Sequence, residues 1–130
     1  MSFHVDLPVI GRTPPGAGRQ EVIAHLKEGA RLIRRKDLSN VVNAGMGHIG
    51  GELSIIDVLA TLYLHEANIT ADNLDDPDRD RVILSKGHAA NALYTTFAAA
   101  GIGASLQHYN PVIDQAVAEQ WQIPASWTLR

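Results

Sequence analysis

Two glycine-flanked histidines constrain this chain of 130 residues more than any other feature of its sequence. His48 lies within the segment 45–51, which reads GMGHIGG, and His88 ends the segment 85–88, which reads SKGH. Each segment stands next to a predicted helix start. Glycine lets the backbone approach a ligand closely, and the first turn of a helix offers unpaired N–H groups to an anion. The pattern therefore indicates a phosphate-bearing ligand held by backbone groups and imidazoles together.

The first helix is predicted over residues 19–43. Its apolar residues recur at steps of three and four, and Gly45 is expected to end it. The helix also carries a basic cluster, which we interpret as a solvated face, although such a cluster could also meet a sugar phosphate. The cluster consists of Arg31, Arg34, Arg35 and Lys36.

A second helix is predicted from Ser54 to Ala67, between the two histidines. Ser54 is a good N-cap with an acidic residue three positions later, and the helix is apolar nearly all round. We therefore expect it to be buried on most sides. The aspartate-rich residues 71–80 follow as a loop. Their spacing lacks the glycine and the closing glutamate of an EF-hand, so we interpret them as a solvated turn rather than a calcium site.

A strand, a glycine turn and a helix are predicted around His88. Residues 82–84 form a short apolar run, typical of a strand buried on both faces of a parallel sheet. An alanine-rich helix is predicted over residues 89–100, ended by Gly101. Ligands of α/β proteins bind at the carboxyl edge of the strands. His88 lies at that edge, and we expect it to contact a ligand.

Composition excludes several classes of function. The length allows one domain with a real core. The net charge of -3 gives no reason to expect a nucleic acid or an anionic membrane as a partner. The absence of cysteine excludes disulfides, thiolate metal sites and cysteine nucleophiles. No apolar run is long enough to span a membrane and the N-terminus lacks a signal-peptide core, so the expected compartment is the cytoplasm.

The two ends of the chain carry weaker signals. Prolines and glycines forbid regular structure over residues 1–18, which we predict to be an extended arm. The arm either lies on the surface of the domain or contacts another subunit, and the sequence leaves both open. Near the other end, Asn110 can cap a helix that begins at Pro111.

The two histidine segments resemble the N-terminal part of transketolases. The second of them extends over residues 78–89, which read DRDRVILSKGHA. The resemblance covers roughly residues 20–101, and the chain is similar above all to the N-terminal subunits of split bacterial forms. It implies an α/β fold with a parallel sheet flanked by helices, incomplete in this chain. Residues 19–130 would then be the N-terminal portion of a thiamine diphosphate-binding domain.

The resemblance also implies roles for individual residues. His88 matches the histidine that bonds the cofactor diphosphate. His48 matches the histidine beside the reactive carbon of the thiazolium ring, which binds sugar hydroxyls and assists proton transfer. Gly47, Gly50 and Gly87 are the expected backbone contacts of the cofactor. The chemistry agrees, because an imidazole can donate to a phosphate or carry a proton. The remaining histidines have no comparable setting: His4, His25, His65 and His108.

The chain also departs from the family pattern. Ile49 stands where the family usually has proline, and the match fades beyond Gly101. The segment that holds the magnesium ion is not recognisable, and neither is the pyrimidine-binding domain with its activating glutamate. We predict no metal ligand in this chain and expect partner chains to supply the Mg²⁺ ligands. A diphosphate without its cation is bound poorly, so the chain alone should bind the cofactor weakly.

We therefore predict one piece of a transketolase-like transferase that uses thiamine diphosphate and Mg²⁺. The expected reaction moves a two-carbon ketol unit from a ketose donor, a small-molecule sugar, to an aldehyde acceptor, and it requires partner chains. One alternative is a non-catalytic interaction subunit that keeps part of the fold. The other is a truncated product or the frameshifted end of a longer chain.

Overall fold

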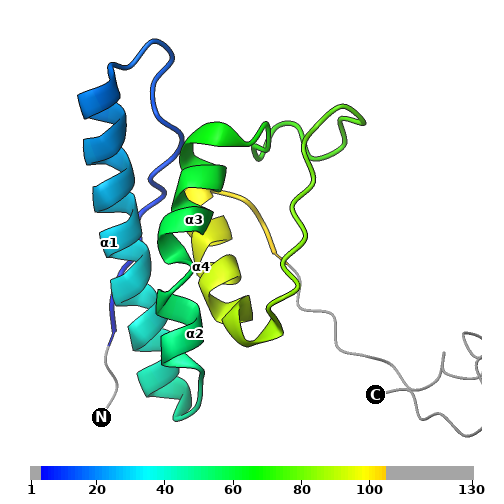
Figure 1. Ribbon diagram of the computed structural model, residues 1–130. Coiled ribbons are helices and arrows are strands. Elements are labelled where there is room, and N and C mark those ends of the chain that lie inside the picture. The colour runs from blue at the N-terminus through cyan, green and yellow to red at the C-terminus, as the bar shows by residue number, and fades with distance from the viewer. Residues whose placement is uncertain (1–3, 105–130) are drawn as a thin grey trace, which may run out of the picture.

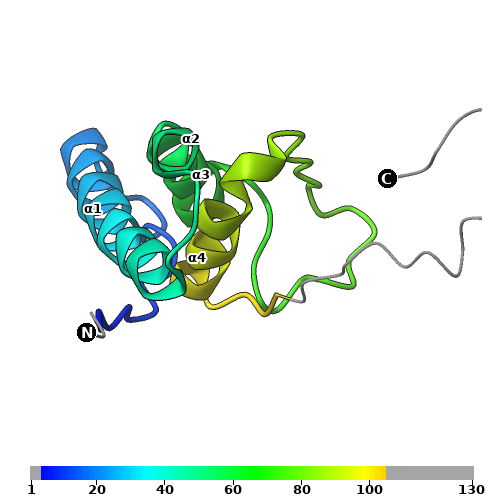
Figure 2. The same cartoon turned by 90° about the horizontal axis from the view of Figure 1, so that it is seen from below.

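Helices account for all the regular structure in residues 4–104, the part of the chain that the computed structural model describes. They are α1 (Arg19–Ala44), α2 (Ile49–Leu53), α3 (Ile56–Thr61), the π-helix η1 (Leu62–Glu66), the 3-10 helix η2 (Gly87–Ala89) and α4 (Ala90–Ala100). In Figure 1, α2, α3 and η1 form one column beside α1. Each of α1, α3 and α4 packs against the other two, as the second view in Figure 2 also shows. None of the described helices is long and apolar enough to cross a membrane. The helix predicted to begin at Pro111 lies outside the described residues.

The first helix agrees with its prediction. The predicted range, 19–43, ends one residue short of α1, and the three- and four-residue steps bury Ala30 and Ile33. Gly45 ends the helix as predicted, with a left-handed φ of 67°. On the buried face Gly29 lets α1 approach η1 closely, because a Cβ at this position would lie 2.7 Å from Leu64 Cδ1.

The core lies where α1, α3, η1 and α4 meet. Tyr63 of η1 and Phe97 of α4 contact each other edge to face there, with ring centroids 5.0 Å apart. Short helices such as α2 and α3 are unstable in isolation, so burial in this core is what orders them. The buried apolar residues are Ala30, Ile33, Ile56, Leu59, Ala60, Tyr63, Leu64, Ala67, Ile69, Ala92, Ala99 and Ile102.

The helix predicted from Ser54 begins earlier and in a different way. α2 starts at Ile49, and the Glu52 side chain supports this start by accepting a hydrogen bond from the His48 N–H. The chain then turns at Ser54 and continues as α3, so the prediction of Ser54 as an N-cap is wrong. The Ser54 hydroxyl instead donates back to Gly51 O at 2.9 Å.

The column of α3 and η1 is buried on one side and open on the other. Ile56, Leu59 and Leu64 are fully buried, whereas Val58 is 55% exposed. The prediction of burial on most sides is therefore only partly confirmed. The column ends at Glu66 with Ala67 as its C-cap, in agreement with the predicted end near Ala67.

The strand predicted over residues 82–84 is not found within residues 4–104, and neither is a sheet. Val82 packs against the core, while Ile83 is 89% exposed. A strand is held by hydrogen bonds to a neighbouring strand, and no such backbone bond joins residues 82–84 to another described segment. The helix predicted after it is confirmed as α4, which Gly101 ends with a left-handed φ of 74°.

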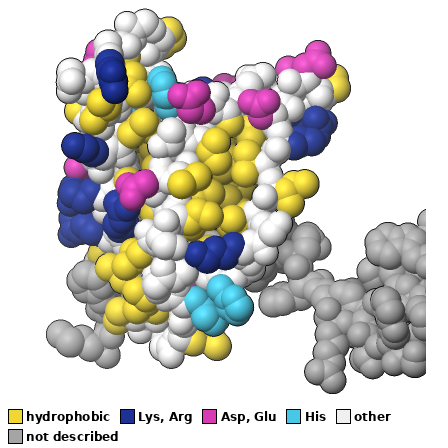
Figure 3. Space-filling view, in the orientation of Figure 1, with side chains coloured by type: hydrophobic (Ala, Val, Ile, Leu, Met, Phe, Trp, Pro, Cys, Tyr) yellow, Lys and Arg dark blue, Asp and Glu magenta, His cyan; other side chains and the backbone are white. Residues whose placement is uncertain are grey.

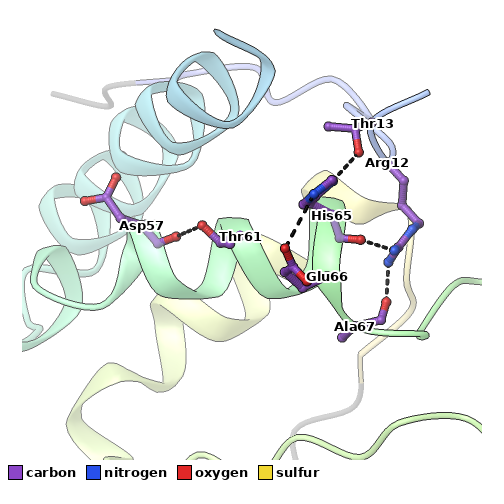
Figure 4. A network of polar contacts seen from close by, with 7 residues as sticks. All are labelled: Arg12, Thr13, Asp57, Thr61, His65, Glu66 and Ala67. Atoms are coloured by element: carbon purple, nitrogen blue, oxygen red, sulfur yellow. Dashed lines mark hydrogen bonds and ion pairs between the residues drawn. The ribbon is translucent and has the colours of Figure 1, made fainter. Parts of the chain in front are cut away.

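Residues 4–18 contain no helix or strand and bind to the helices of the same chain. The backbone N–H groups of Ile10 and Thr13 donate to carbonyls of α4 and η1, each at 2.8 Å. Figure 4 shows the Arg12 guanidinium donating to the carbonyl oxygens of His65 and Ala67. A cation there satisfies carbonyls that a helix end leaves unpaired. The arm is thus held against η1 and α4, and a contact with another subunit stays a prediction.

Residues 68–86 leave the helices as a long irregular excursion, which Figures 1 and 2 both show. Asn68 and Asp80 close it, because Asp80 Oδ2 accepts from the Asn68 N–H at 2.7 Å and the Asp80 N–H donates to Asn68 O at 3.2 Å. The loop predicted over residues 71–80 lies within this excursion, and its aspartates are exposed.

The basic cluster of α1 is a solvated face only in part. Arg31 is exposed and pairs with Glu28 of the same helix at 2.6 Å. Arg34 reaches across to the carboxylate of Asp57 and pairs with it. One arginine of the cluster therefore links α1 to α3.

Candidate functional site

The structure brings the two predicted histidines into contact. The imidazole rings of His48 and His88 have centroids 4.3 Å apart and are tilted by 52°. Both residues are exposed. In Figure 3 histidine side chains gather on the lower part of the face, directly below a lysine or arginine side chain. Two segments far apart in the sequence thus form one surface site.

Each histidine is held at the start of a helix. His48 is the N-cap of α2, and its N–H donates to Glu52 Oε1 at 3.3 Å. This bond resembles the return bond of a capping box, in which an acidic side chain of the first turn satisfies the N–H of the cap. His88 lies in η2, and α4 follows directly. The helix starts therefore fix where the two imidazoles leave the backbone.

Lys86 ties the two segments together. Its Nζ donates to Gly51 O at 3.0 Å and to Ser54 Oγ at 2.8 Å. Gly51 also lies against the second segment, because a Cβ added there would be 3.9 Å from the Cβ of His88. An ammonium group at the carboxyl end of α2 is favourable, since the last carbonyls of a helix lack partners within it. Lys86 thus joins the loop that carries His88 to the helix that carries His48.

The three glycines predicted as cofactor contacts differ in their surroundings. A Cβ added at Gly50 or Gly87 would meet no atom of the protein within 4 Å. These two positions therefore leave open space beside the backbone, where a ligand can approach. Gly47 is different, because a Cβ there would lie 2.6 Å from Val41 Cγ2. Gly47 is required by packing of the chain against itself.

Replacing Gly47 with alanine is expected to lower the free energy of unfolding by about 1–3 kcal/mol, the usual cost of overpacking. The branched side chain of Val41 is stiff and cannot rotate its methyl groups away easily. Urea denaturation of the chain measures this cost. In a Val41→Ala background the cost of Gly47→Ala should shrink, because the two shortest contacts, those with the Val41 methyl groups, are then gone. Gly50→Ala is the matched control and should leave stability unchanged or raise it. An equal cost in both backgrounds would contradict the packing role.

The structure also contains a layer of buried polar side chains next to His48, which the sequence analysis did not predict. Glu52 of α2 is 3% exposed and Asp37 of α1 is fully buried. Asn91 of α4 donates to Asp37 Oδ1 at 2.7 Å, and Asn40 donates to Asn91 Oδ1 at 3.1 Å. A signal for this layer does exist, because Asp37 follows the buried Ile33 by four residues. An acidic residue on the buried stripe of a helix needs polar partners.

The environment of Asp37 favours the protonated form of its carboxyl group. Burial, the neighbouring charge of Glu52 and a hydrogen bond with Glu52 together raise the pKa of Asp37 from 3.8 to about 7. A cavity of about 210 Å³ adjoins this layer. It is lined by Asn40, Val41, Ala44, Met46, Gly47, Glu52 and Asn91.

A metal site is not formed by the part of the chain that is described. No group of three or more histidine, cysteine, aspartate or glutamate side chains within residues 4–104 is arranged to hold a metal ion. The residues of the site therefore do not fit a magnesium ion by themselves, and we derive no step through one.

The other described histidines make contacts within the chain. His65 Nδ1 lies 2.6 Å from Thr13 Oγ1, as Figure 4 shows, and His25 Nε2 lies 3.1 Å from Gly11 O. His4 pairs with Asp6 at 2.8 Å in the arm. These contacts within the chain account for the three histidines, so no ligand is needed to explain them. His108 lies outside the described residues.

Comparison with known protein families identifies the domain to which these residues correspond. Residues 26–114 match the family described as transketolase, thiamine diphosphate binding domain. The matched range contains both histidines, Lys86 and the buried layer. No solved structure matches the chain significantly.

Curated relatives are similar over part of the chain. It is 45% identical over 76 residues to a 6-deoxy-6-sulfo-D-fructose transketolase subunit of Clostridium sp. (strain MSTE9), covering 58% of the chain and 28% of the relative. It is 41% identical over 68 residues to an apulose-4-phosphate transketolase subunit of Phocaeicola vulgatus, covering 52% of the chain and 24% of the relative. Human transketolase is 33% identical over 91 residues, which is 70% of the chain and 15% of the relative. The chain thus spans less than a third of the length of these relatives.

Proposed function

The chain belongs to the transketolase family, matching its N-terminal thiamine diphosphate-binding domain, and from this premise we propose that it is one piece of a transketolase-like transferase. The proposed reaction moves a two-carbon ketol unit from a ketose donor to an aldehyde acceptor. The chain acts in it together with partner chains. Thiamine diphosphate, when bound, supplies the chemistry for breaking and forming the carbon–carbon bond.

The observation that carries this proposal is the contact between His48 and His88. Their rings lie 4.3 Å apart at an exposed surface, although the segments that carry them are distant in the sequence. An imidazole is a hydrogen-bond donor to phosphate and a common carrier of protons at neutral pH. One ligand can therefore contact both side chains, with its diphosphate at one and its reacting centre at the other.

The residues of the site fit a diphosphate in their chemistry. His88 would donate a hydrogen bond to a diphosphate oxygen, and the open backbone at Gly50 and Gly87 would allow close approach. His48 would contact the sugar and hold or move a proton at its hydroxyl oxygen. These roles follow from the family resemblance, and the open geometry of the histidine pair supports them.

Partner chains are proposed because the site is not complete within the described residues. No metal-holding group is present there, and a diphosphate carries several negative charges that a cation normally balances. Two of the relatives are named as subunits, which implies that their activity is divided among chains. We therefore propose that partners supply the Mg²⁺ ligands and the pyrimidine-binding domain.

This proposal predicts that tight cofactor binding requires a partner. In titration calorimetry with thiamine diphosphate and Mg²⁺, the chain alone should give at most weak heat. The chain co-expressed with the products of neighbouring genes should bind tightly, in a magnesium-dependent manner, and transfer ketol units in a coupled assay. Tight magnesium-dependent binding by the chain alone would contradict the need for a partner. A complex that binds no cofactor would favour the non-catalytic interaction subunit instead.

A further inference from the structure

Two buried carboxyl groups meet beside the His48 turn, and neither is fully paired. Asp37 and Glu52 are 0% and 3% exposed. Asp37 Oδ1 accepts from the Asn91 amide at 2.7 Å, and Glu52 Oε1 accepts from the His48 N–H at 3.3 Å. The second oxygen of each, Asp37 Oδ2 and Glu52 Oε2, has no hydrogen-bond donor among residues 4–104. A buried acceptor without a donor is costly, and Glu52 is the charged group that acts on Asp37.

A single proton held between the two carboxyl groups would satisfy both oxygens. Two adjacent carboxylates cannot both stay ionised away from water, whereas a carboxyl and a carboxylate form a strong hydrogen bond. The raised pKa of Asp37, which burial and the charge of Glu52 produce, is the expected consequence of such an arrangement.

We propose that Asp37 and Glu52 share one proton, and that this pair is a positioning device for His48. Glu52 holds the His48 N–H directly, so a change in the charge of the pair is transmitted to the N-cap of α2. When the shared proton leaves, repulsion from Asp37 displaces Glu52 and loosens the turn. The effect of this change on the catalytic role of His48 rests on the proposed function. The shared proton itself does not depend on that function.

No other charged group nearby takes over the role of the proton. α4 faces Asp37 with Asn91, and its Thr95 hydroxyl accepts from Asn40; neither Asn91 nor Thr95 titrates. The other titratable groups on the flanking segments are Lys36 beside Asp37 on α1, His48 at the start of α2, and Lys86 and His88 before α4. The Lys86 ammonium group is engaged with Gly51 O and Ser54 Oγ. Among the described residues no lysine or arginine forms an ion pair with Asp37 or Glu52.

The pair makes stability depend on pH in a defined direction. Because the pKa of Asp37 is higher in the folded chain than its ordinary value of 3.8, the folded state binds the proton more tightly. The contribution is fully present below pH 3.8 and is lost as the pH rises to about 7. The contribution of Asp37 to stability should therefore decline between about pH 4 and pH 7, because over this range the unfolded chain gives up the proton more readily than the folded chain.

Asp37→Asn tests the proposal in the full chain. The asparagine amide mimics a permanently protonated carboxyl, since its oxygen still accepts from Asn91 and its nitrogen can donate to Glu52. At pH 8, exchange of the His48 amide hydrogen in the wild-type chain should be about tenfold faster than in the variant. At pH 5 the two rates should agree. Asp72→Asn, which removes the same charge from an exposed loop, should match the wild type at both values.

Three results would overturn the proposal. The first is equal exchange of the His48 amide in wild type and Asp37→Asn at pH 8. The second is an unchanged pH dependence of the free energy of unfolding in that variant. The third needs no variant: a carbon-13 titration of the wild-type Asp37 carboxyl with an ordinary midpoint near 4.

The assembled enzyme supplies a readout that a merely structural role would not affect. Wild-type turnover should fall above about pH 7, whereas Asp37→Asn should move this fall to higher pH. Identical pH profiles would contradict a positioning role. If the complex shows no ketol transfer at all, the proposed function fails, while the exchange and titration experiments still decide whether the proton is shared.

Discussion

Replacing His48 with alanine in the assembled enzyme is expected to lower turnover by about 10²–10⁴-fold, the usual contribution of a positioned acid–base group. His48 is exposed, stands at the N-cap of α2 and contacts the ring of His88. A group that carries a proton acts while bonds change, so its loss reduces kcat with little effect on cofactor affinity. Steady-state kinetics with donor and acceptor, at saturating cofactor, measures the change.

The control for this variant is His4→Ala, which removes an exposed histidine from the arm and should leave kcat unchanged. Because the His48 ring also packs against His88, cofactor affinity is measured in parallel. An assembled His48→Ala variant with wild-type turnover would contradict the role given to His48. A fall in cofactor affinity with unchanged kcat would instead assign cofactor binding to His48.

Replacing His88 with alanine is expected to weaken thiamine diphosphate binding by about 10- to 150-fold. This range corresponds to the loss of one hydrogen bond to a charged group, about 1.5–3 kcal/mol. A bond to the diphosphate is present in the ground and transition states alike, so kcat at saturating cofactor should change little. Titration calorimetry of the complex measures the affinity.

A His88→Gln variant separates the hydrogen bond from the shape of the side chain. Glutamine keeps a donor of similar reach and should restore part of the affinity, whereas alanine should not. If both variants bind the cofactor like the wild type, His88 does not hold the diphosphate.

The helices were predictable where local chemistry alone decides the structure. Gly45 and Gly101 end α1 and α4 in left-handed conformations because only residues without a Cβ adopt them at low cost. The apolar steps of α1 place Ala30 and Ile33 in the core as expected. Such signals depend on residues a few positions apart, and the sequence contains all of them.

Two predictions that depend on residues distant in the sequence were wrong. Ser54 has the composition of an N-cap, but Lys86 and Gly51 take its hydroxyl into another contact. Residues 82–84 have the composition of a buried strand, yet a strand also needs a paired neighbour, and the described residues offer none. In both cases the local pattern identified the chemical character of the residues but not the groups that they contact.

The candidate site was predictable in its residues but not in its support. His48, His88 and the glycine turns stand out because of their unusual composition. The carboxyl pair beneath them does not, because Asp37 and Glu52 lie on different helices and only the packing of α1 against α2 joins them. The periodicity of α1 indicates that Asp37 needs a polar partner, but it does not show which residue of another helix provides one.

The bond from Lys86 to the end of α2 has a consequence for what the chain brings to an assembly. Closing a loop of several tens of residues costs roughly 3 kcal/mol of chain entropy. Because the folded helices already hold both segments together, a ligand that reaches the histidine pair does not bear that cost. Such preorganisation raises affinity without any additional contact. Under the proposed function, the chain would therefore bring the histidine pair to its partners already assembled.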